Sequence, residues 1–105
     1  MDAKTHSRYR ARAKIVKAMA HPSRLFIIDQ LAEGERCVCE LTDMIGADTS
    51  TVSKHLSVLK EAGIVKDEKR GLQVFYTLRT PCVTRLFSCI EAVVKSNIEA
   101  QLAAM

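Results

Sequence analysis

The chain lacks long apolar segments. Apolar residues make up 48% of its 105 residues, yet they come in runs of only a few, whereas a membrane-spanning helix needs roughly 20 in succession. The N-terminal segment is basic and has no apolar stretch of the kind that a secretory signal carries. Internal repeats and low-complexity segments are also absent. We therefore expect one globular cytoplasmic domain over residues 1–105, with no membrane among its partners.

Acidic residues are scarce near the N-terminus. The whole chain has 16 Lys and Arg against 12 Asp and Glu, a formal net charge of +4. Within residues 1–20 only Asp2 opposes a group of basic residues, namely Lys4, Arg8, Arg10, Arg12, Lys14 and Lys17. A basic arm of this kind suits a polyanion such as nucleic acid. The same pattern is also typical of a solvated helix face, so charge alone does not decide between the two.

The four cysteines do not have the spacing of a small secreted disulfide framework. In the cytoplasm we expect them to be reduced. Cys82 and Cys89 are seven residues apart, which on one helix separates their Cα atoms by ~10.5 Å and is too far for a disulfide. Cys37 and Cys39 form C-x-C rather than C-x-x-C, and no parallel-sheet pattern is present. A thiol oxidoreductase is therefore the least favoured function, and we expect no enzyme.

Glycine and proline are few, and they mark boundaries. Pro22 suits the first turn of a helix, Gly34 and Gly46 suit helix ends, Asp48 is a good N-cap, and Pro81 breaks the chain again. Between these points the apolar spacing predicts helices over about 5–20, 22–33, 39–45, 48–62 and 82–103. Two β-prone runs separated by charged residues predict a hairpin over about 64–78.

Three of the expected helices show distinct apolar faces. The second helix carries Leu25, Ile28 and Leu31 on the side that we expect to be buried. The fourth helix buries a stripe of Val52, Leu56 and Leu59. The last helix has a much wider stripe that extends over residues 83–98.

The order of these elements is that of a winged helix-turn-helix: mainly α, with a hairpin wing after a helix-turn-helix at about 39–62. The second helix of such a pair presents its first residues to base edges in the major groove. Here those turns carry short or polar side chains. We therefore expect DNA contacts from Thr49, Ser50, Thr51, Ser53, Lys54 and His55, and from Lys69 and Arg70 in the wing. The alternative for the Thr and Ser residues is ordinary helix capping.

Three segments, HPSRLFIIDQL, ERCVCEL and STVSKHLSVLKEAGIVKDEKRGLQVFYTL, together resemble the ArsR/SmtB metalloregulators in order and spacing. The resemblance covers about residues 14–80. It implies a winged-helix homodimer that represses an operon and releases double-stranded operator DNA on binding a metal or metalloid. It also implies a dimer interface made by the first and last helices, at about 5–20 and 82–103. Two reading helices in one dimer imply an inverted-repeat operator.

The CVC motif resembles the thiolate motif of arsenic, antimony, cadmium and lead sensors. It implies that Cys37 and Cys39 bind a thiophilic regulatory ligand, As(III) or Sb(III), with no cofactor required. The arsenic-type pattern has a third cysteine where this chain has Thr42. The N-terminal cysteines of the cadmium type and the C-terminal histidines of the zinc type are also missing. Two thiolates make a partial site, and Cys82 and Cys89 are the candidate additional ligands.

The spacing of the CVC thiols suggests a mechanism. Residues i and i+2 do not face each other in a helix, whereas they share a face in extended chain. Both thiols can therefore chelate one ion only if the short helix starts from extended or distorted backbone. Ligand binding would then pull on residues 37–41 and shift the reading helices. A thiol redox or persulfide switch of the same fold is the alternative, and an interaction module without DNA binding is a further one.

Overall fold

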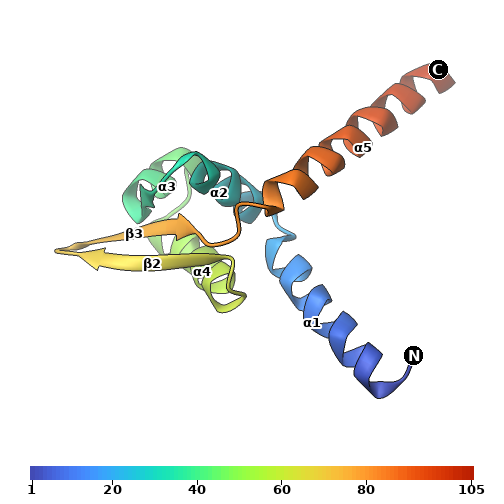
Figure 1. Cartoon of the computed structure of the whole chain (residues 1–105). Coiled ribbons are helices and arrows are strands. Elements are labelled where there is room, and N and C mark those ends of the chain that lie inside the picture. Colours follow the sequence, from blue (N-terminus) through green and yellow to red (C-terminus); the bar gives the residue numbers. More distant parts are fainter.

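The computed structural model describes all of residues 1–105. Its elements are α1 (Ala3–Met19), α2 (Pro22–Glu33), β1 (Arg36–Cys37), α3 (Val38–Ile45), α4 (Thr49–Glu61), β2 (Val65–Arg70), β3 (Gln73–Leu78) and α5 (Val83–Ala104). Figure 1 shows α2, α3, α4 and the β2–β3 hairpin together as one body, from which α1 and α5 project on the side away from the hairpin tip. The expected mainly helical, winged helix-turn-helix fold is confirmed. None of the helices is both long and apolar enough to span a membrane.

The helices begin where the sequence offers a capping side chain. Nδ1 of His21 accepts the N–H of Ser23 at 3.0 Å, and Pro22 occupies the first turn of α2. The carboxylate of Asp48 accepts the N–H of Thr51 at 2.7 Å at the start of α4. Gly46 ends α3 with a left-handed φ of 77°, a conformation that costs glycine little. The expected helix bounds agree with the observed ones to within two residues because these signals are local.

The sheet has one more strand than expected. Its order is β1-β3-β2, and both pairings are antiparallel. The hairpin pairs Val65 with Leu78 at one end and Arg70 with Gln73 at the other. No strand was expected between the helices predicted over about 22–33 and 39–45, but Arg36–Cys37 forms β1 there and pairs with the middle of β3. Two residues are too few to show an alternating pattern, so this strand is defined by its tertiary partner.

One apolar core holds the body together. It is formed by Ala18, Met19, Ile27, Ile28, Leu31, Leu41, Val52, Leu56, Leu59, Ile64, Val65 and Tyr76. The expected stripe of α4 is buried as a whole. In α2 the expectation was wrong at Leu25, which is 37% exposed, while Ile27 is fully buried. The side of α2 that meets the core is therefore rotated from the expected one.

Helix α5 carries an apolar face that the chain itself does not cover. Only Val83 and Phe87 near its start pack against the core, and no residue of the helix is fully buried. The exposed large side chains on it are Leu86, Ile90, Val93, Val94, Ile98 and Leu102. On α1, Ile15 and Val16 are exposed in the same way. These two helices are the pair that projects from the body in Figure 1.

Candidate thiol sensor and DNA-reading surface

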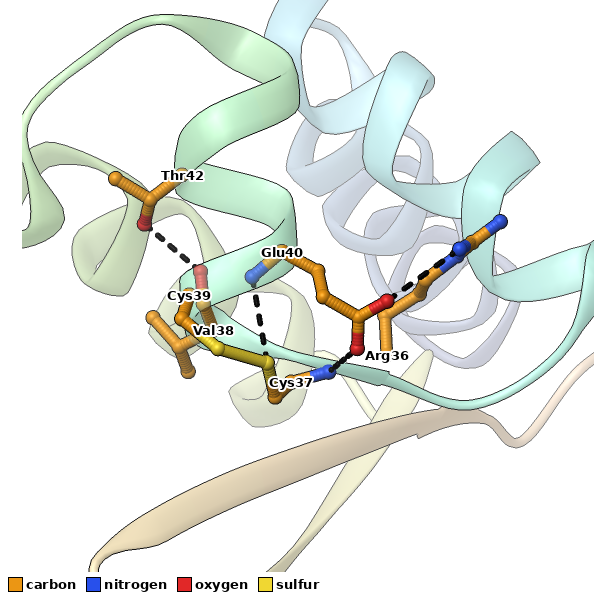
Figure 2. The surroundings of a disulfide bond; sticks show 6 residues. All are labelled: Arg36, Cys37, Val38, Cys39, Glu40 and Thr42. Carbon is orange, nitrogen blue, oxygen red and sulfur yellow. Dashed lines mark hydrogen bonds and ion pairs between the residues drawn. A yellow bond between two sulfur atoms is a disulfide. The ribbon is translucent and has the colours of Figure 1, made fainter.

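Cys37 and Cys39 lie at the junction of β1 and α3 (Figure 2). Cys37 has extended backbone, with φ −80° and ψ 161°, and Cys39 belongs to the first helical turn. Their Cα atoms are 5.4 Å apart, and the two sulfur atoms are joined in a disulfide. The expectation of a reduced pair is therefore wrong for this structure. The reason is geometric: the change from strand to helix brings both side chains to one point, as the spacing required.

The start of α3 surrounds Cys37 with polar backbone groups. The N–H of Glu40 donates to Sγ of Cys37 at 3.3 Å, and the Glu40 carboxylate accepts the N–H of Cys37 at 3.1 Å. This reciprocal arrangement is a capping box in which a cysteine is the N-cap. Cys37 is 4% exposed, whereas Cys39 is exposed. The start of α3 therefore provides one backbone N–H donor to the sulfur of Cys37.

A cavity of about 310 Å³ lies beside the cysteine pair. Its walls come from three parts of the chain: the CVC segment, the start of α4 and the beginning of β3 with the hairpin turn. The lining residues are Cys37, Val38, Cys39, Thr49, Ser53, Leu72, Gln73 and Val74. A group attached to either sulfur therefore lies next to both elements that a winged helix uses to read DNA.

The CVC segment is also tied to the wing by charge. Both terminal nitrogens of the Arg70 guanidinium donate to the carboxylate of Glu35, at 2.6 and 2.8 Å. Arg70 also reaches Glu68 at 3.0 Å and lies over the ring of Phe75 at 4.8 Å. The hydrogen bonds that Arg70 donates to the carboxylates of Glu35 and Glu68 raise the pKa of Arg70 above its ordinary value. The residue before β1 is thus joined to the last residue of β2, a link that no sequence pattern signalled.

The start of α4 presents most of the expected reading residues to solvent. Thr49, Ser50, Thr51 and Lys54 are exposed, and Ser53 is half-buried at the cavity. The hydroxyl of Ser50 donates to Asp48 at 2.9 Å, next to the bond from the Thr51 N–H. Hydrogen bonds from Thr51 and Ser50 hold the pKa of the Asp48 carboxyl below its ordinary value. Capping accordingly involves Ser50 and Thr51, and leaves Thr49 and Lys54 free.

His55 differs from the other expected reading residues. It is half-buried, and its ring centroid is 4.4 Å from that of His21, the N-cap of α2. Burial, followed by the positive charges of His21 and Arg24, lowers the pKa of His55. A DNA contact by His55 stays a prediction. The contact between the two rings joins the reading helix to the start of α2.

The remaining expected residues come from the wing and from α5. Lys69 is exposed on β2, where its register partner is Val74. Cys82 is the N-cap of α5, Cys89 lies further along that helix, and both are free and exposed. No group of three or more His, Cys, Asp and Glu side chains gathers in the chain to hold a metal ion. The structure thus brings Cys37 and Cys39 together and adds neither α5 cysteine to them within one chain.

Comparison with known proteins identifies the family. The family described as bacterial regulatory protein, arsR family, matches residues 21–67. Over 85 residues, the chain is 39% identical to an uncharacterized HTH-type transcriptional regulator of Methanocaldococcus jannaschii, covering 80% of this chain and 96% of that protein. The chain belongs to the ArsR family. This ArsR-family chain is therefore a transcriptional regulator and not an enzyme.

Two further similarities extend the match. The ArsR-family chain is 43% identical over 68 residues to the HTH-type transcriptional repressor SmtB of Mycobacterium tuberculosis. The matched region covers 65% of this chain and 50% of SmtB. The fold of this chain matches the homodimeric winged helix-turn-helix DNA-binding domain of a possible ArsR-family regulator of Mycobacterium bovis. That likeness has a TM-score of 0.78 and 30% identity, and covers 95% of this chain and 93% of the other.

Proposed function

We propose that this ArsR-family repressor binds operator DNA as a homodimer and releases it when As(III) or Sb(III) binds Cys37 and Cys39. One observation carries the proposal: two sulfur atoms converge on a cavity whose other walls are the start of α4 and the wing. Thiolates are soft ligands and favour thiophilic ions. A ligand held there contacts the DNA-reading elements directly, so its binding and DNA binding are coupled.

Exposed groups on α4 and the wing support the DNA part of the proposal. Thr49, Ser50, Thr51 and Lys54 present donors and acceptors for base edges or phosphates, and Lys69 adds positive charge on the wing. The dimer is supported by the uncovered apolar faces of α1 and α5 and by the homodimeric M. bovis domain. A two-fold dimer places its reading helices at half-sites about 34–36 Å apart, on an inverted repeat.

The sheet and the ion pairs supply the coupling. Cys37 pairs with Phe75 of β3, and Glu35 holds Arg70 of β2, so a change in backbone at the CVC segment is passed to the wing. The same segment starts α3, the first helix of the helix-turn-helix. Closing both sulfurs on one ligand constrains residues 37–41 and alters the placement of both reading elements. By linkage, DNA must weaken ligand binding by the same factor by which the ligand weakens DNA binding.

Fluorescence anisotropy of the reduced protein on its own promoter DNA, titrated with arsenite and antimonite, tests this function. We expect release near one equivalent per chain, and loss of that response in Cys37→Ser and Cys39→Ser, which keep DNA binding. Cys89→Ser is the matched control, because it removes an equally small thiol from outside the cavity. Tight DNA binding by the wild-type chain that neither ion relieves would contradict the ligand assignment.

A redox switch at the same pair is the second candidate. The bonded sulfurs of Cys37 and Cys39 support it, because they place the pair at disulfide distance beside a cavity that the reading elements line. Oxidation by a mild thiol oxidant would then release DNA in the absence of any metalloid. If the oxidised and reduced proteins bind the operator equally well and arsenite alone releases it, the redox function is excluded.

A further inference from the structure

Three basic side chains from two helices line a second cavity, where α1 meets α2. Its volume is about 350 Å³, and Lys14, Lys17 and Arg24 line it together with Glu61 of α4. We propose that this cavity binds a small organic phosphate, with the three cations around the phosphoryl group and the organic part against the end of α4. The site is separate from the cysteine pair, because the two cavities share no lining residue.

The positive charge of this lining has little compensation within the chain. Four ion pairs occur in the structure, and none of them includes Lys14, Lys17 or Arg24. Glu61 is the one acidic residue of the lining, so three positive charges face one negative charge. The charge of Arg24 also extends to α4, where it contributes, after burial and the charge of a neighbouring histidine, to the lowered pKa of His55. An anion is therefore the class of ligand that the lining favours.

Arg24 is held so that one edge of its guanidinium remains unused. Its Nη1 donates to the carbonyl of Ala18 at 3.1 Å, which fastens the start of α2 to the last turn of α1. Its Nε is buried and has no hydrogen-bond partner, and a buried donor without an acceptor is unfavourable. The Nε and Nη2 edge of a guanidinium can hold two oxygens of one phosphoryl group. A modest shift of the Arg24 side chain toward the cavity brings this edge to the ligand.

Helical geometry keeps the cavity open in the proposed dimer. Lys14, Lys17 and Ala18 line the cavity, and their spacings of three and four residues place them on one face of α1. Ile15 and Val16, which are the exposed apolar residues near the end of α1, lie off that face. Burial of these two residues against a partner chain therefore does not require burial of the two lysines.

The wall formed by α4 suits the organic part of the ligand. Val58 and Ala62 line the cavity at the last turns of α4, whereas the expected reading residues occupy positions 49–55 near its start. Sites for small molecules have volumes of about 300–1,000 Å³, and a phosphate monoester carries a charge of about −1.5 to −2 at neutral pH. The cavity therefore fits such a ligand in size and in charge. Its position also leaves the first turns of α4 free, so ligand and DNA can be bound at once.

The same cations have a possible structural role. Positive charge near the C-terminus of a helix stabilises that helix through its dipole. Lys17 in the last turn of α1 fits this role, and so does Nη1 of Arg24. The role leaves Lys14 and the free edge of Arg24 unexplained. The test therefore measures binding of a ligand rather than stability of the fold.

The test uses phenyl phosphate as the probe, on the full-length protein without DNA and at constant ionic strength. Isothermal titration calorimetry gives the dissociation constant, and inorganic phosphate, succinate and benzyl alcohol are the comparison ligands. We expect about one phenyl phosphate per chain, bound at least about tenfold more tightly than each of the others. Ala62→Leu narrows the apolar end of the cavity, so it should weaken phenyl phosphate and leave inorganic phosphate unchanged.

Substitutions of the lining assign the binding to the cavity. Arg24→Gln should weaken phenyl phosphate by about tenfold or more, and Lys14→Gln and Lys17→Gln by about threefold each, because their side chains are exposed. Glu61→Gln removes the opposing charge and should strengthen binding. Lys4→Gln is the matched control, since it lies on α1 outside the lining. If circular dichroism shows that Arg24→Gln is unfolded, the double substitution of Lys14 and Lys17 replaces it, with a loss of about tenfold expected.

Three results would overturn the inference. Phenyl phosphate could fail to bind, or succinate or inorganic phosphate could bind as tightly as it does. Binding that is lost in Lys54→Gln and retained in the cavity variants would place the anion on the DNA-reading part of α4 instead. Binding that Lys4→Gln weakens as much as Lys14→Gln does would reduce it to the overall charge of α1. None of these results bears on release of DNA by arsenite, because the cysteine pair takes no part in them.

Discussion

Replacing Ile98 by alanine is expected to weaken the proposed homodimer by a measurable amount. Ile98 is 52% exposed in the single chain and belongs to the uncovered stripe on α5. Complete burial of an aliphatic side chain stabilises by about 1.5–3 kcal/mol, so burying the exposed half of this one contributes about 1 kcal/mol. In a two-fold dimer the residue occurs twice. Ile98→Ala therefore costs association about 2 kcal/mol, or about 30-fold in the dimer dissociation constant.

Sedimentation equilibrium over a range of protein concentrations measures that constant. A stronger version, Ile98→Glu, places a charge in the interface and is expected to give monomers at every accessible concentration. Ala92→Glu is the matched control, because helical geometry puts position 92 on the side of α5 opposite the apolar stripe. The reasoning is refuted if Ile98→Ala and Ile98→Glu leave the dimer constant unchanged, or if Ala92→Glu disrupts the dimer equally.

Three further predictions concern single side chains. The pKa of His55 in the folded protein lies below its ordinary 6.5. As the pH drops below 6.5, the unfolded chain therefore takes up a proton at this residue before the folded chain does, and the free energy of unfolding decreases. His55→Gln should reduce the difference between the free energies of unfolding measured with urea at about pH 7.5 and about pH 5.5, with His6→Gln as the control. Gly46→Ala should lower the free energy of unfolding by about 1 kcal/mol because of the left-handed φ of 77°, and an unchanged urea midpoint would show that the turn relaxes. Glu35→Gln should free Arg70 to bind a DNA phosphate, which steepens the dependence of DNA affinity on salt concentration by about one released ion per chain. An unchanged salt dependence would mean that Arg70 does not reach the DNA.

Local signals made much of the fold predictable. Asp48 and Gly46 sit beside the turn of the helix-turn-helix, where each acts on its own few neighbours. The stripe on α4 is buried as expected because its apolar residues lie on a single face of the helix, and that face packs against the core. Leu25 was misplaced because α2 is apolar on two adjoining sides, and only the packing of other elements decides which side is inside.

The site depends on contacts that no local pattern encodes. β1 exists because β3 is there to pair with it. The cavity is assembled from segments around residues 38, 50 and 73, and neither its existence nor its apolar wall follows from their separate sequences. The tilted contact between the rings of His55 and His21 also joins two helices that are far apart in the sequence, so no local pattern predicts it. The convergence of the cysteines could be predicted from the sequence, because two thiols at that spacing meet only where the helix starts from extended or distorted backbone.

Cys37 is at once the N-cap of α3 and one of the two candidate ligand sulfurs, and this double position affects how such a regulator loses its response over evolution. Serine is among the residues that cap helices best, so the change from cysteine to serine keeps the helix start and removes the thiolate. Such a variant would fold and bind its operator but would no longer respond to the ligand. The genes under its control would then remain repressed when the toxic ligand is present, and natural selection would act on the lost response rather than on a misfolded protein.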